Sequence, residues 1–110
     1  MQSNKIDYQQ AEIALQYLVD TDEQFAYAKS YYDGLYEQRK VVIAIECNKN
    51  KGSAAEKLKL AEASEAYEQH LDKLKQAQLD FEILKAKRHT KQLIIDTWRS
   101  VNASMKMGNI

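Results

Sequence analysis

Residues 48–53 read Asn-Lys-Asn-Lys-Gly-Ser and form the one dense cluster of turn-forming residues in the chain. Gly52 can adopt the left-handed backbone conformation that closes a helix end. Ser53 and Glu56 have the spacing of a capping box, in which a serine and a glutamate satisfy free backbone donors where a helix starts. The segment therefore predicts a turn, followed by a helix that begins near Ala54.

On both sides of this turn, the sequence repeats at alternating steps of three and four residues, which is typical of a coiled coil. In the first half the repeat comprises Ala14, Leu18, Thr21, Phe25, Ala28, Tyr32, Leu35, Arg39 and Val42. In the second half it comprises Leu60, Ala63, Tyr67, His70, Leu74, Ala77, Phe81, Leu84, Arg88, Lys91, Ile95, Trp98 and Asn102. No proline interrupts either half. The predicted fold class is all-α: a long, coiled-coil-like antiparallel hairpin of two helices. Its predicted parts are one domain over 1–110, a helix over about 5–48, a turn over 49–53 and a helix over about 54–105.

Three positions could interrupt these helices. The segment Asp20-Thr21-Asp22-Glu23 could cap a new helix, and a break there would give three helices. A pause near Ser64 is an alternative in the second half, because serine competes for backbone hydrogen bonds. Gly34 indicates that a bulky side chain packs against the bare backbone or that the helix bends. We prefer uninterrupted helices because neither repeat slips.

The order of charges favours the antiparallel arrangement. Acidic residues outnumber basic ones in 1–37 and 61–84, and the reverse holds in 38–60 and 85–110. Folding the chain at Gly52 places each acidic segment beside a basic one. Each surface pair contributes only about 0–1 kcal/mol, but a parallel pairing would oppose like charges.

The apolar surface is wider than one seam between two helices. The residues that flank the repeats are Ile6, Ile13, Tyr17, Ile43, Ile45, Leu71, Ile83, Ile94 and Val101. A single facing helix cannot cover so broad a band. We therefore expect a homodimer that completes a four-helix bundle.

Composition argues against several classes of protein. The 110 residues (12.7 kDa) hold 16 basic and 16 acidic side chains, so net charge gives no reason for bulk attraction to nucleic acid or membranes. No stretch approaches the roughly 18 consecutive apolar residues of a membrane span. The first residues lack the features of a signal peptide. Cys47 is the only cysteine, which excludes an internal disulfide. These features predict a soluble cytoplasmic protein without a membrane partner.

The basic run at 85–91 is the strongest candidate for contact with nucleic-acid phosphates. Its candidate residues are Lys85, Lys87, Arg88 and Lys91, which recur at spacings that a helix could present to a nucleic-acid backbone. The alternative is a solvated face that complements the acidic residues of the first helix. Overall neutrality favours this alternative.

Aromatic residues supply candidates for a protein interface. The candidates are Tyr27, Tyr31, Tyr36, Ile13, Tyr17 and Trp98. Tyr32 and Tyr67 lie within the repeats, so we expect them in the core. Trp98 also lies in its repeat, as a core residue or an interface anchor.

Residues with catalytic or metal-binding chemistry are scarce. His70 and His89 lie several helical turns apart, and neither has a second histidine or a cysteine at ligand spacing. The sequence contains no glycine-rich phosphate loop and no nucleophile elbow. We expect no enzymatic activity, no catalytic or metal-binding residues and no cofactor.

Four stretches carry a resemblance to a known group of proteins. They are Ala63-Ser-Glu-Ala-Tyr67, Glu82-Ile-Leu-Lys-Ala-Lys-Arg88, Thr97-Trp-Arg-Ser-Val-Asn-Ala103 and the final Gly108-Asn-Ile110. The chain resembles small all-helical hairpin proteins of tailed phages and prophages, often encoded among early recombination and replication genes. Those proteins often have an arginine-rich segment after the Asn-Ala pair, where this chain has Ser104-Met-Lys-Met107. They have no established activity, so the resemblance implies an accessory factor in the host cytoplasm.

These observations predict a non-enzymatic phage accessory protein that acts by protein–protein interaction in phage DNA recombination or replication. The expected partners are a second copy of the chain and a phage or host factor of DNA metabolism. A nucleic-acid-binding protein that uses the basic run is the alternative. A structural virion component is the second alternative.

Overall fold

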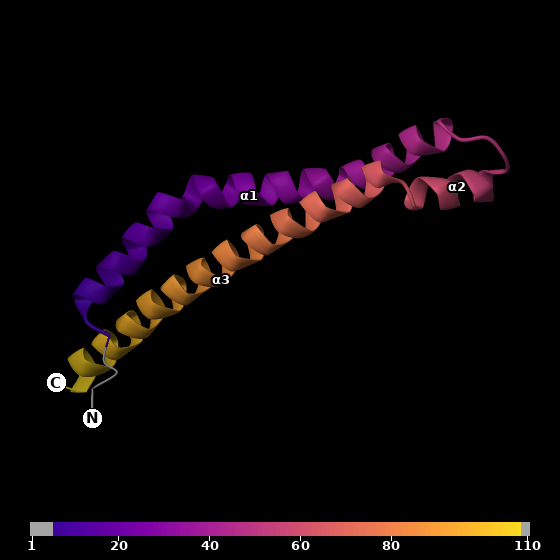
Figure 1. Cartoon of the computed structure of the whole chain (residues 1–110). Coiled ribbons are helices and arrows are strands. Elements are labelled where there is room, and N and C mark those ends of the chain that lie inside the picture. Colours follow the sequence, from indigo (N-terminus) through magenta and orange to yellow (C-terminus); the bar gives the residue numbers. More distant parts are fainter. Residues whose placement is uncertain (1–5, 109–110) are drawn as a thin grey trace, which may run out of the picture. The chain divides into compact units, whose positions relative to one another are not determined.

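The computed structural model describes residues 6–108, which form three helices (Figure 1). Helix α1 spans Tyr8–Asn48, α2 spans Ala54–Glu62 and α3 spans Glu65–Gly108. No β-strand occurs within these residues, so the all-α prediction is confirmed. The predicted helix start near residue 5 and the final Asn-Ile of the phage-like stretches lie outside the described residues.

Helix α1 begins with a capping box that the sequence reading missed. The backbone amide of Gln10 donates to Asp7 Oδ1 at 2.8 Å, and the Asp7 amide donates to Gln10 Oε1 at 3.0 Å. The helix then continues through Thr21, so a break near Asp20 is wrong. The Thr21 hydroxyl donates to the Tyr17 carbonyl inside the helix at 2.8 Å, and Thr21 is buried. Thr21 therefore packs between the helices and does not cap a new one.

The predicted turn is confirmed. Gly52 has a φ of +119°, and a Cβ there would lie 2.6 Å from Glu56 Oε2. Ser53 caps α2: its hydroxyl accepts from the Glu56 amide at 3.2 Å and donates to the Glu56 carboxylate at 3.1 Å. The positive φ therefore favours glycine at position 52, whereas the exposed Glu56 carboxylate can move away from a Cβ.

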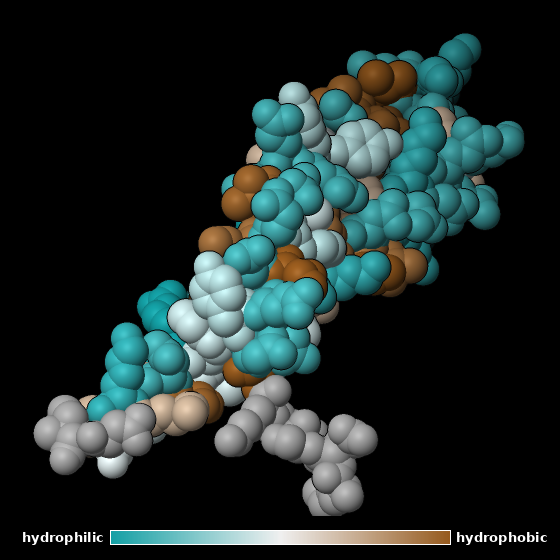
Figure 2. Space-filling view, turned by 90° about the vertical axis from the view of Figure 1, so that its left-hand side faces the viewer, coloured by the Kyte–Doolittle hydropathy of each residue, from teal (hydrophilic) through white to brown (hydrophobic). Residues whose placement is uncertain are grey.

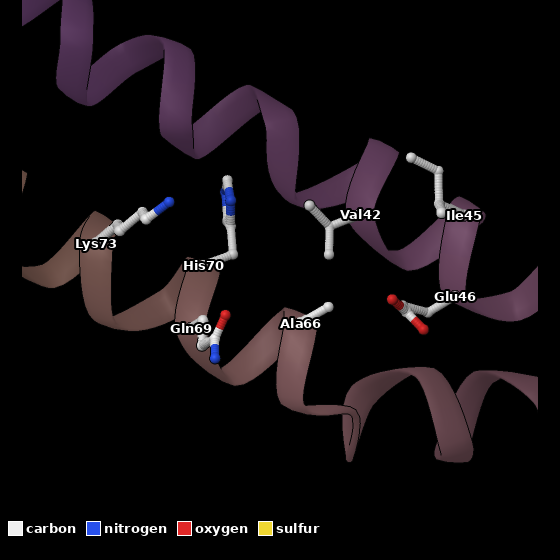
Figure 3. Close-up of a pocket in the computed structure, with 7 residues that line it drawn as sticks. All are labelled: Val42, Ile45, Glu46, Ala66, Gln69, His70 and Lys73. Carbon is white, nitrogen blue, oxygen red and sulfur yellow. The ribbon is translucent and has the colours of Figure 1, made fainter.

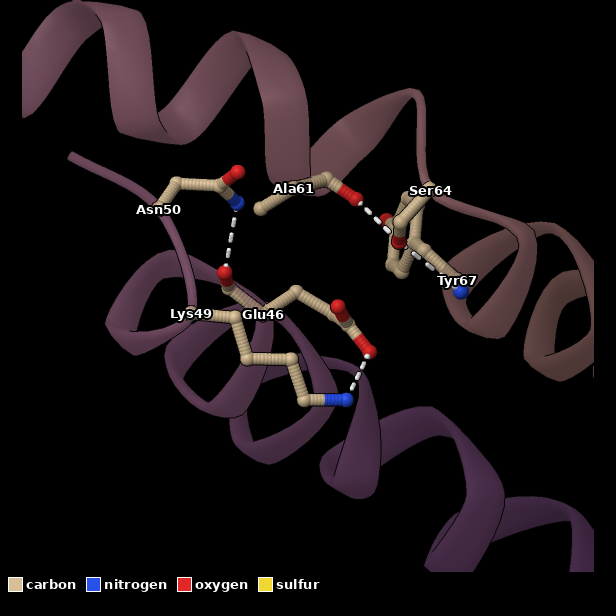
Figure 4. A network of polar contacts seen from close by, with 6 residues as sticks. All are labelled: Glu46, Lys49, Asn50, Ala61, Ser64 and Tyr67. Carbon is tan, nitrogen blue, oxygen red and sulfur yellow. Dashed lines mark hydrogen bonds and ion pairs between the residues drawn. The ribbon is translucent and has the colours of Figure 1, made fainter.

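The second half is not one helix, because α2 ends at Glu62 and α3 begins at Glu65. The Ser64 hydroxyl donates to the Ala61 carbonyl at 2.6 Å and accepts from the Tyr67 amide at 3.2 Å (Figure 4). Ser64 thus caps α3 and interrupts the helix, as in the alternative weighed from the sequence. The extra helix results from this break.

The chain divides into two compact units, and α1 and α3 contribute to both. Of the described residues, unit 1 contains 6–25 and 83–108, and unit 2 contains 26–82. In unit 1 the Tyr8 and Trp98 rings meet edge to face with centroids 5.6 Å apart, while Lys91 reaches Tyr17. Residue numbers therefore rise along α1 as they fall along α3, and the helices are antiparallel.

In unit 2 the same relationship holds between α1 and α3. The Tyr32 and Phe81 rings stack with centroids 5.8 Å apart, and Leu35 lies against His70. The predicted long antiparallel helix pair is confirmed in each unit. The dimer and the four-helix bundle remain predictions.

The packed seam follows the repeats closely. Every repeat residue from Ala14 to Val42, and from Tyr67 to Asn102, is buried or half-buried. The repeat predicts that Leu60 and Ala63 are buried, and this prediction is wrong because both are exposed. Ala61, between them, is completely buried. The break at Ser64 changes the helical phase, so the residues of α2 do not continue the repeat of α3.

The core contains few large side chains. The buried hydrophobic residues are Ala11, Ala14, Leu35, Ala61, Ala77, Phe81 and Leu84. Among the described residues, no large side chain is fully buried. Hydrophobic side chains lie at the surface among hydrophilic ones (Figure 2), and of the predicted flanking residues Ile13, Ile45 and Ile83 are exposed. Each unit thus leaves apolar surface for other molecules.

Candidate interaction surfaces

Six residues of α1 in unit 2 form a second line along the helix, beside the seam. We call this line the α1 stripe; it comprises Tyr27, Tyr31, Gly34, Gln38, Val41 and Ile45. The spacing again alternates between three and four residues, so these side chains share one strip of helix surface. Tyr27 is 74% exposed, and Tyr31, Val41 and Ile45 are each more than half exposed. None of the six residues is charged.

The opposite flank of α1 in unit 2 is charged. Lys29 Nζ pairs with Asp33 Oδ2 at 2.9 Å, and the Arg39 guanidinium lies 3.8 Å from the centre of the Tyr36 ring. Tyr36 is nine residues from Tyr27, which places the two side chains on opposite sides of the helix. The three tyrosines grouped from the sequence are therefore split: Tyr27 and Tyr31 share the stripe, and Tyr36 does not.

A hollow of about 240 Å³ lies beside the Ile45 end of the stripe (Figure 3). It is lined by Val42, Ile45, Glu46, Ala66, Gln69, His70 and Lys73. His70 Nε2 lies 2.7 Å from the Leu35 carbonyl oxygen; a carbonyl only accepts, so Nε2 carries the proton. This hydrogen bond fixes the imidazole in the wall of the hollow. The hollow therefore has a defined shape.

Glu46 closes the end of this hollow nearest the turn. Its side chain is largely buried, and its carboxylate accepts from Lys49 Nζ at 3.1 Å (Figure 4). The Glu46 carbonyl accepts from Asn50 Nδ2 at 2.8 Å. These contacts of Glu46 therefore stabilise the C-terminal end of α1. Within residues 6–108, no three side chains of histidine, cysteine, aspartate or glutamate form a potential metal site.

In unit 1 Arg88 joins α3 to α1. Its Nη1 donates to the Leu18 carbonyl at 2.9 Å and to Thr21 Oγ1 at 2.7 Å. Its Nη2 pairs with Asp22 Oδ1 at 2.7 Å, and the guanidinium lies 4.9 Å from the centre of the Phe25 ring. The side chain is only 18% exposed. The donors that would contact phosphate are thus engaged within the helix pair.

The basic run is divided by the helical geometry. Lys87 and Lys91 share a shallow hollow of about 320 Å³ with Tyr17 and Thr90. Lys91 Nζ lies 5.4 Å from the centre of the Tyr17 ring, within the range of a cation–π contact. Lys85 is two residues from Lys87, about 160° around the helix, and belongs to the other flank. The structure thus brings together two of the four predicted phosphate contacts.

Trp98 lies between two further hollows in unit 1. The first Trp98 groove, about 120 Å³, is lined by Tyr8, Ala11, Glu12, Leu15, Ile95 and Trp98. The second Trp98 groove, about 220 Å³, is lined by Ile6, Asp7, Trp98, Val101, Asn102 and Met105. The sequence reading identified Trp98 but missed Tyr8 and Leu15. Leu15 lies one residue after the seam residue Ala14, and Tyr8 lies seven residues before Leu15, so the heptad spacing was the available signal.

The remaining predicted interface residues in unit 1 are Ile13 and Tyr17. Ile13 is exposed, and half-buried Tyr17 lies between the seam and the lysines.

None of the helices in the described part of the chain is long and apolar enough to span a membrane. Comparison with protein-family models, curated proteins and solved structures found no significant match.

Proposed function

We propose that this chain is a non-enzymatic accessory protein that binds another protein through the first Trp98 groove. The observation that supports this proposal is the half-buried Trp98 ring beside Tyr8 and Leu15, both of which are exposed. Tryptophan and tyrosine dominate the binding energy of many protein interfaces, because they bury a large area with few rotatable bonds. The groove thus offers an anchor for an apolar side chain of a partner.

The size of the groove favours a protein over a small-molecule ligand. Its volume is about 120 Å³, whereas pockets for small organic molecules usually measure roughly 300–1,000 Å³. A single apolar side chain of a protein fits such a hollow. The rest of the partner would cover Leu15 and the adjacent surface of α1.

The resemblance to phage proteins supplies the biological setting of this proposal. We place the chain in the host cytoplasm, with a phage or host factor of DNA recombination or replication as its partner. Arg88 and the helix pair act as the scaffold that holds Trp98 and Tyr8 in contact.

Capture from infected cells followed by reconstitution tests this proposal. The captured protein would be purified, and its dissociation constant measured for the unchanged chain, Leu15→Arg and Leu79→Arg. Leu79 is the matched control, because it is 53% exposed in unit 2 and Leu15 is 54% exposed. We expect Leu15→Arg to weaken binding by about tenfold or more, and Leu79→Arg to leave it unchanged. Equal binding by all three proteins contradicts the proposal.

Binding of nucleic acid is the second candidate function, favoured by the shared hollow of Lys87, Lys91 and Tyr17. Two ammonium groups near an aromatic ring could hold a phosphate and stack a base. Fluorescence anisotropy at low salt with a labelled single strand tests this function. Binding should weaken with salt and with Lys87→Glu, but not with Lys59→Glu in unit 2. No binding at tens of micromolar protein would exclude it.

A further inference from the structure

The α1 stripe in unit 2 is an uncharged aromatic and aliphatic surface interrupted by one glycine. A Cβ built at Gly34 meets no neighbouring atom within 4 Å beyond the backbone of its own helix. No bulky side chain of the same chain therefore packs against the backbone at Gly34. The helix also continues through position 34. Packing within the chain thus gives no reason for glycine at this position.

We propose that a second copy of this chain covers the α1 stripe, with the two α1 helices antiparallel and a two-fold axis at Gly34. Two glycines then face each other at the centre of the interface. Without side chains at this point, the two backbones approach closely and the flanking side chains interdigitate. The open space at Gly34 is therefore filled by the second copy.

The charge pattern matches a second copy as the occupant. The stripe from Tyr27 to Ile45 carries no charge, so two copies can meet along it without opposing like charges. The charged flank, with Lys29 and Asp33, would place ionised side chains in a buried contact at a desolvation cost. Self-association therefore favours the stripe over the other flank.

The spacing of the stripe is compatible with two-fold symmetry. Tyr27 and Val41 each lie seven residues from Gly34, so each faces the other across an axis at Gly34. Tyr31 lies three residues from the axis and Gln38 lies four, so the two are about 1.5 Å from the same level, and the Gln38 amide can hydrogen-bond the tyrosine hydroxyl. An isologous contact requires such pairing, because a residue that contacts a second residue of the other copy is in turn contacted by it, so each contact occurs twice.

The hollow beside Ile45 accommodates the tyrosine of the second copy. Tyr27 of the second copy falls level with Val41, about one helical turn from this hollow. Helical side chains tilt toward the N-terminus of their own helix, which in an antiparallel copy is the direction of Ile45. The ring therefore points to the end of the hollow that Val42, Ile45 and Ala66 line, away from Lys73 (Figure 3). Each copy would insert one tyrosine into the other.

The dimer face extends beyond the stripe itself. The part of the stripe that is symmetric about Gly34, from Tyr27 to Val41, covers about 21 Å along α1, and the face is about 20 Å wide when the α3 residues of the hollow are included. Its flat projection is then about 420 Å², and side-chain relief raises the accessible area toward the roughly 800 Å² that each partner buries in a standard interface. This surface lies in unit 2 and does not depend on the proposed partner at Trp98.

Single cysteines in a Cys47→Ser background test the arrangement in the full chain. The variants are Gly34→Cys, Tyr27→Cys and Val41→Cys, oxidised and separated on a non-reducing gel. We expect Gly34→Cys alone to form a covalent dimer, because a residue on the axis meets its own counterpart. Tyr27→Cys alone should not, because its counterpart lies about 21 Å away along the helix and disulfides need Cα atoms within about 7 Å. A mixture of Tyr27→Cys and Val41→Cys should cross-link.

Two results overturn the proposal. Cross-linking of each variant by itself would indicate a parallel dimer in register, and cross-linking of none would indicate that the stripe is not a dimer contact. Light scattering provides a second measurement, in which a monomeric unchanged protein also contradicts the proposal. These readouts contain no other protein, so they are independent of binding at Leu15.

Placing a bulky residue at position 34 should weaken the dimer without disturbing the fold of the single chain. Gly34→Leu should raise the dimer dissociation constant by about tenfold or more, because the side chain forces the backbones apart. Lys40→Leu, at an exposed position on the charged flank of α1, should leave it unchanged. Circular dichroism should show equal or greater helix content for both variants. An unchanged dissociation constant for Gly34→Leu overturns the axis at Gly34.

Discussion

The Arg88 guanidinium on α3 donates to the Asp22 carboxylate on α1 at 2.7 Å, although the two residues are 66 positions apart in the sequence. The same guanidinium donates to the Leu18 carbonyl and the Thr21 hydroxyl. One side chain thus satisfies three acceptors on the facing helix. Arginine suits this position because its planar fork presents several fixed donors.

Arg88→Ala should lower the free energy of unfolding by about 2 kcal/mol, because it removes charge-assisted hydrogen bonds from a partly buried position. The Asp22 pair alone contributes at most about 1 kcal/mol, since the carboxylate is mostly exposed. Arg88→Lys should recover only part of the loss, because one ammonium cannot reach all three acceptors. Urea unfolding followed by circular dichroism measures both changes. Lys87→Ala is the control, and an equal loss there would contradict the role of Arg88.

Gly52→Ala should destabilise the chain by about 1–2 kcal/mol, because alanine disfavours the positive φ and its Cβ would approach the Glu56 carboxylate. Gly34→Ala should have the opposite effect and stabilise the monomer. It adds a good helix former in open space and should stabilise α1 by roughly 0.5–1 kcal/mol. Thermal unfolding at low protein concentration compares the two variants. Destabilisation by both would show that position 34 is constrained within the chain.

Ser64→Ala should cost about 1 kcal/mol, because it removes the cap on the first turn of α3. The Tyr67 amide would lose its acceptor, and the Ala61 carbonyl would lose a donor. Ser30→Ala, at an exposed position inside α1, should be neutral or slightly stabilising because alanine is the better helix former. Chemical denaturation of both variants tests the difference. A neutral Ser64→Ala would mean that the break between α2 and α3 does not depend on this hydroxyl.

The long-range architecture could be predicted because helix pairing follows periodicity. The repeat from Tyr67 to Asn102 coincides with the packed face of α3, and Gly52 marks the turn. The role of Ser64 was harder to predict, since a serine within a helical pattern can face solvent or cap a new helix. Only tertiary packing decides between these outcomes.

Parts of the candidate sites were recognisable in the sequence, but their grouping was not. Trp98 and Tyr27 stood out by residue type, whereas Tyr36 was placed with Tyr27 although the helix separates them. Arg88 belonged to a basic run, and its contacts with α1 depend on which residues lie opposite. A repeat predicts which face of a helix is buried, but the partner of each polar side chain depends on the register of the two helices.

The repeat and the observed burial disagree most clearly at Leu60 and Ala61. The repeat places Leu60 in the core, but this side chain is 51% exposed, whereas Ala61 is 0% exposed. Leu60→Ala should therefore change the free energy of unfolding by less than about 0.5 kcal/mol. Ala61→Leu should cost roughly 1–3 kcal/mol, because the added atoms have no space without displacing α1 or the turn. Thermal unfolding of both variants gives the answer. A large loss for Leu60→Ala with a tolerated Ala61→Leu would mean that α2 packs in the phase of the repeat, and that the helical break at Ser64 does not shift it.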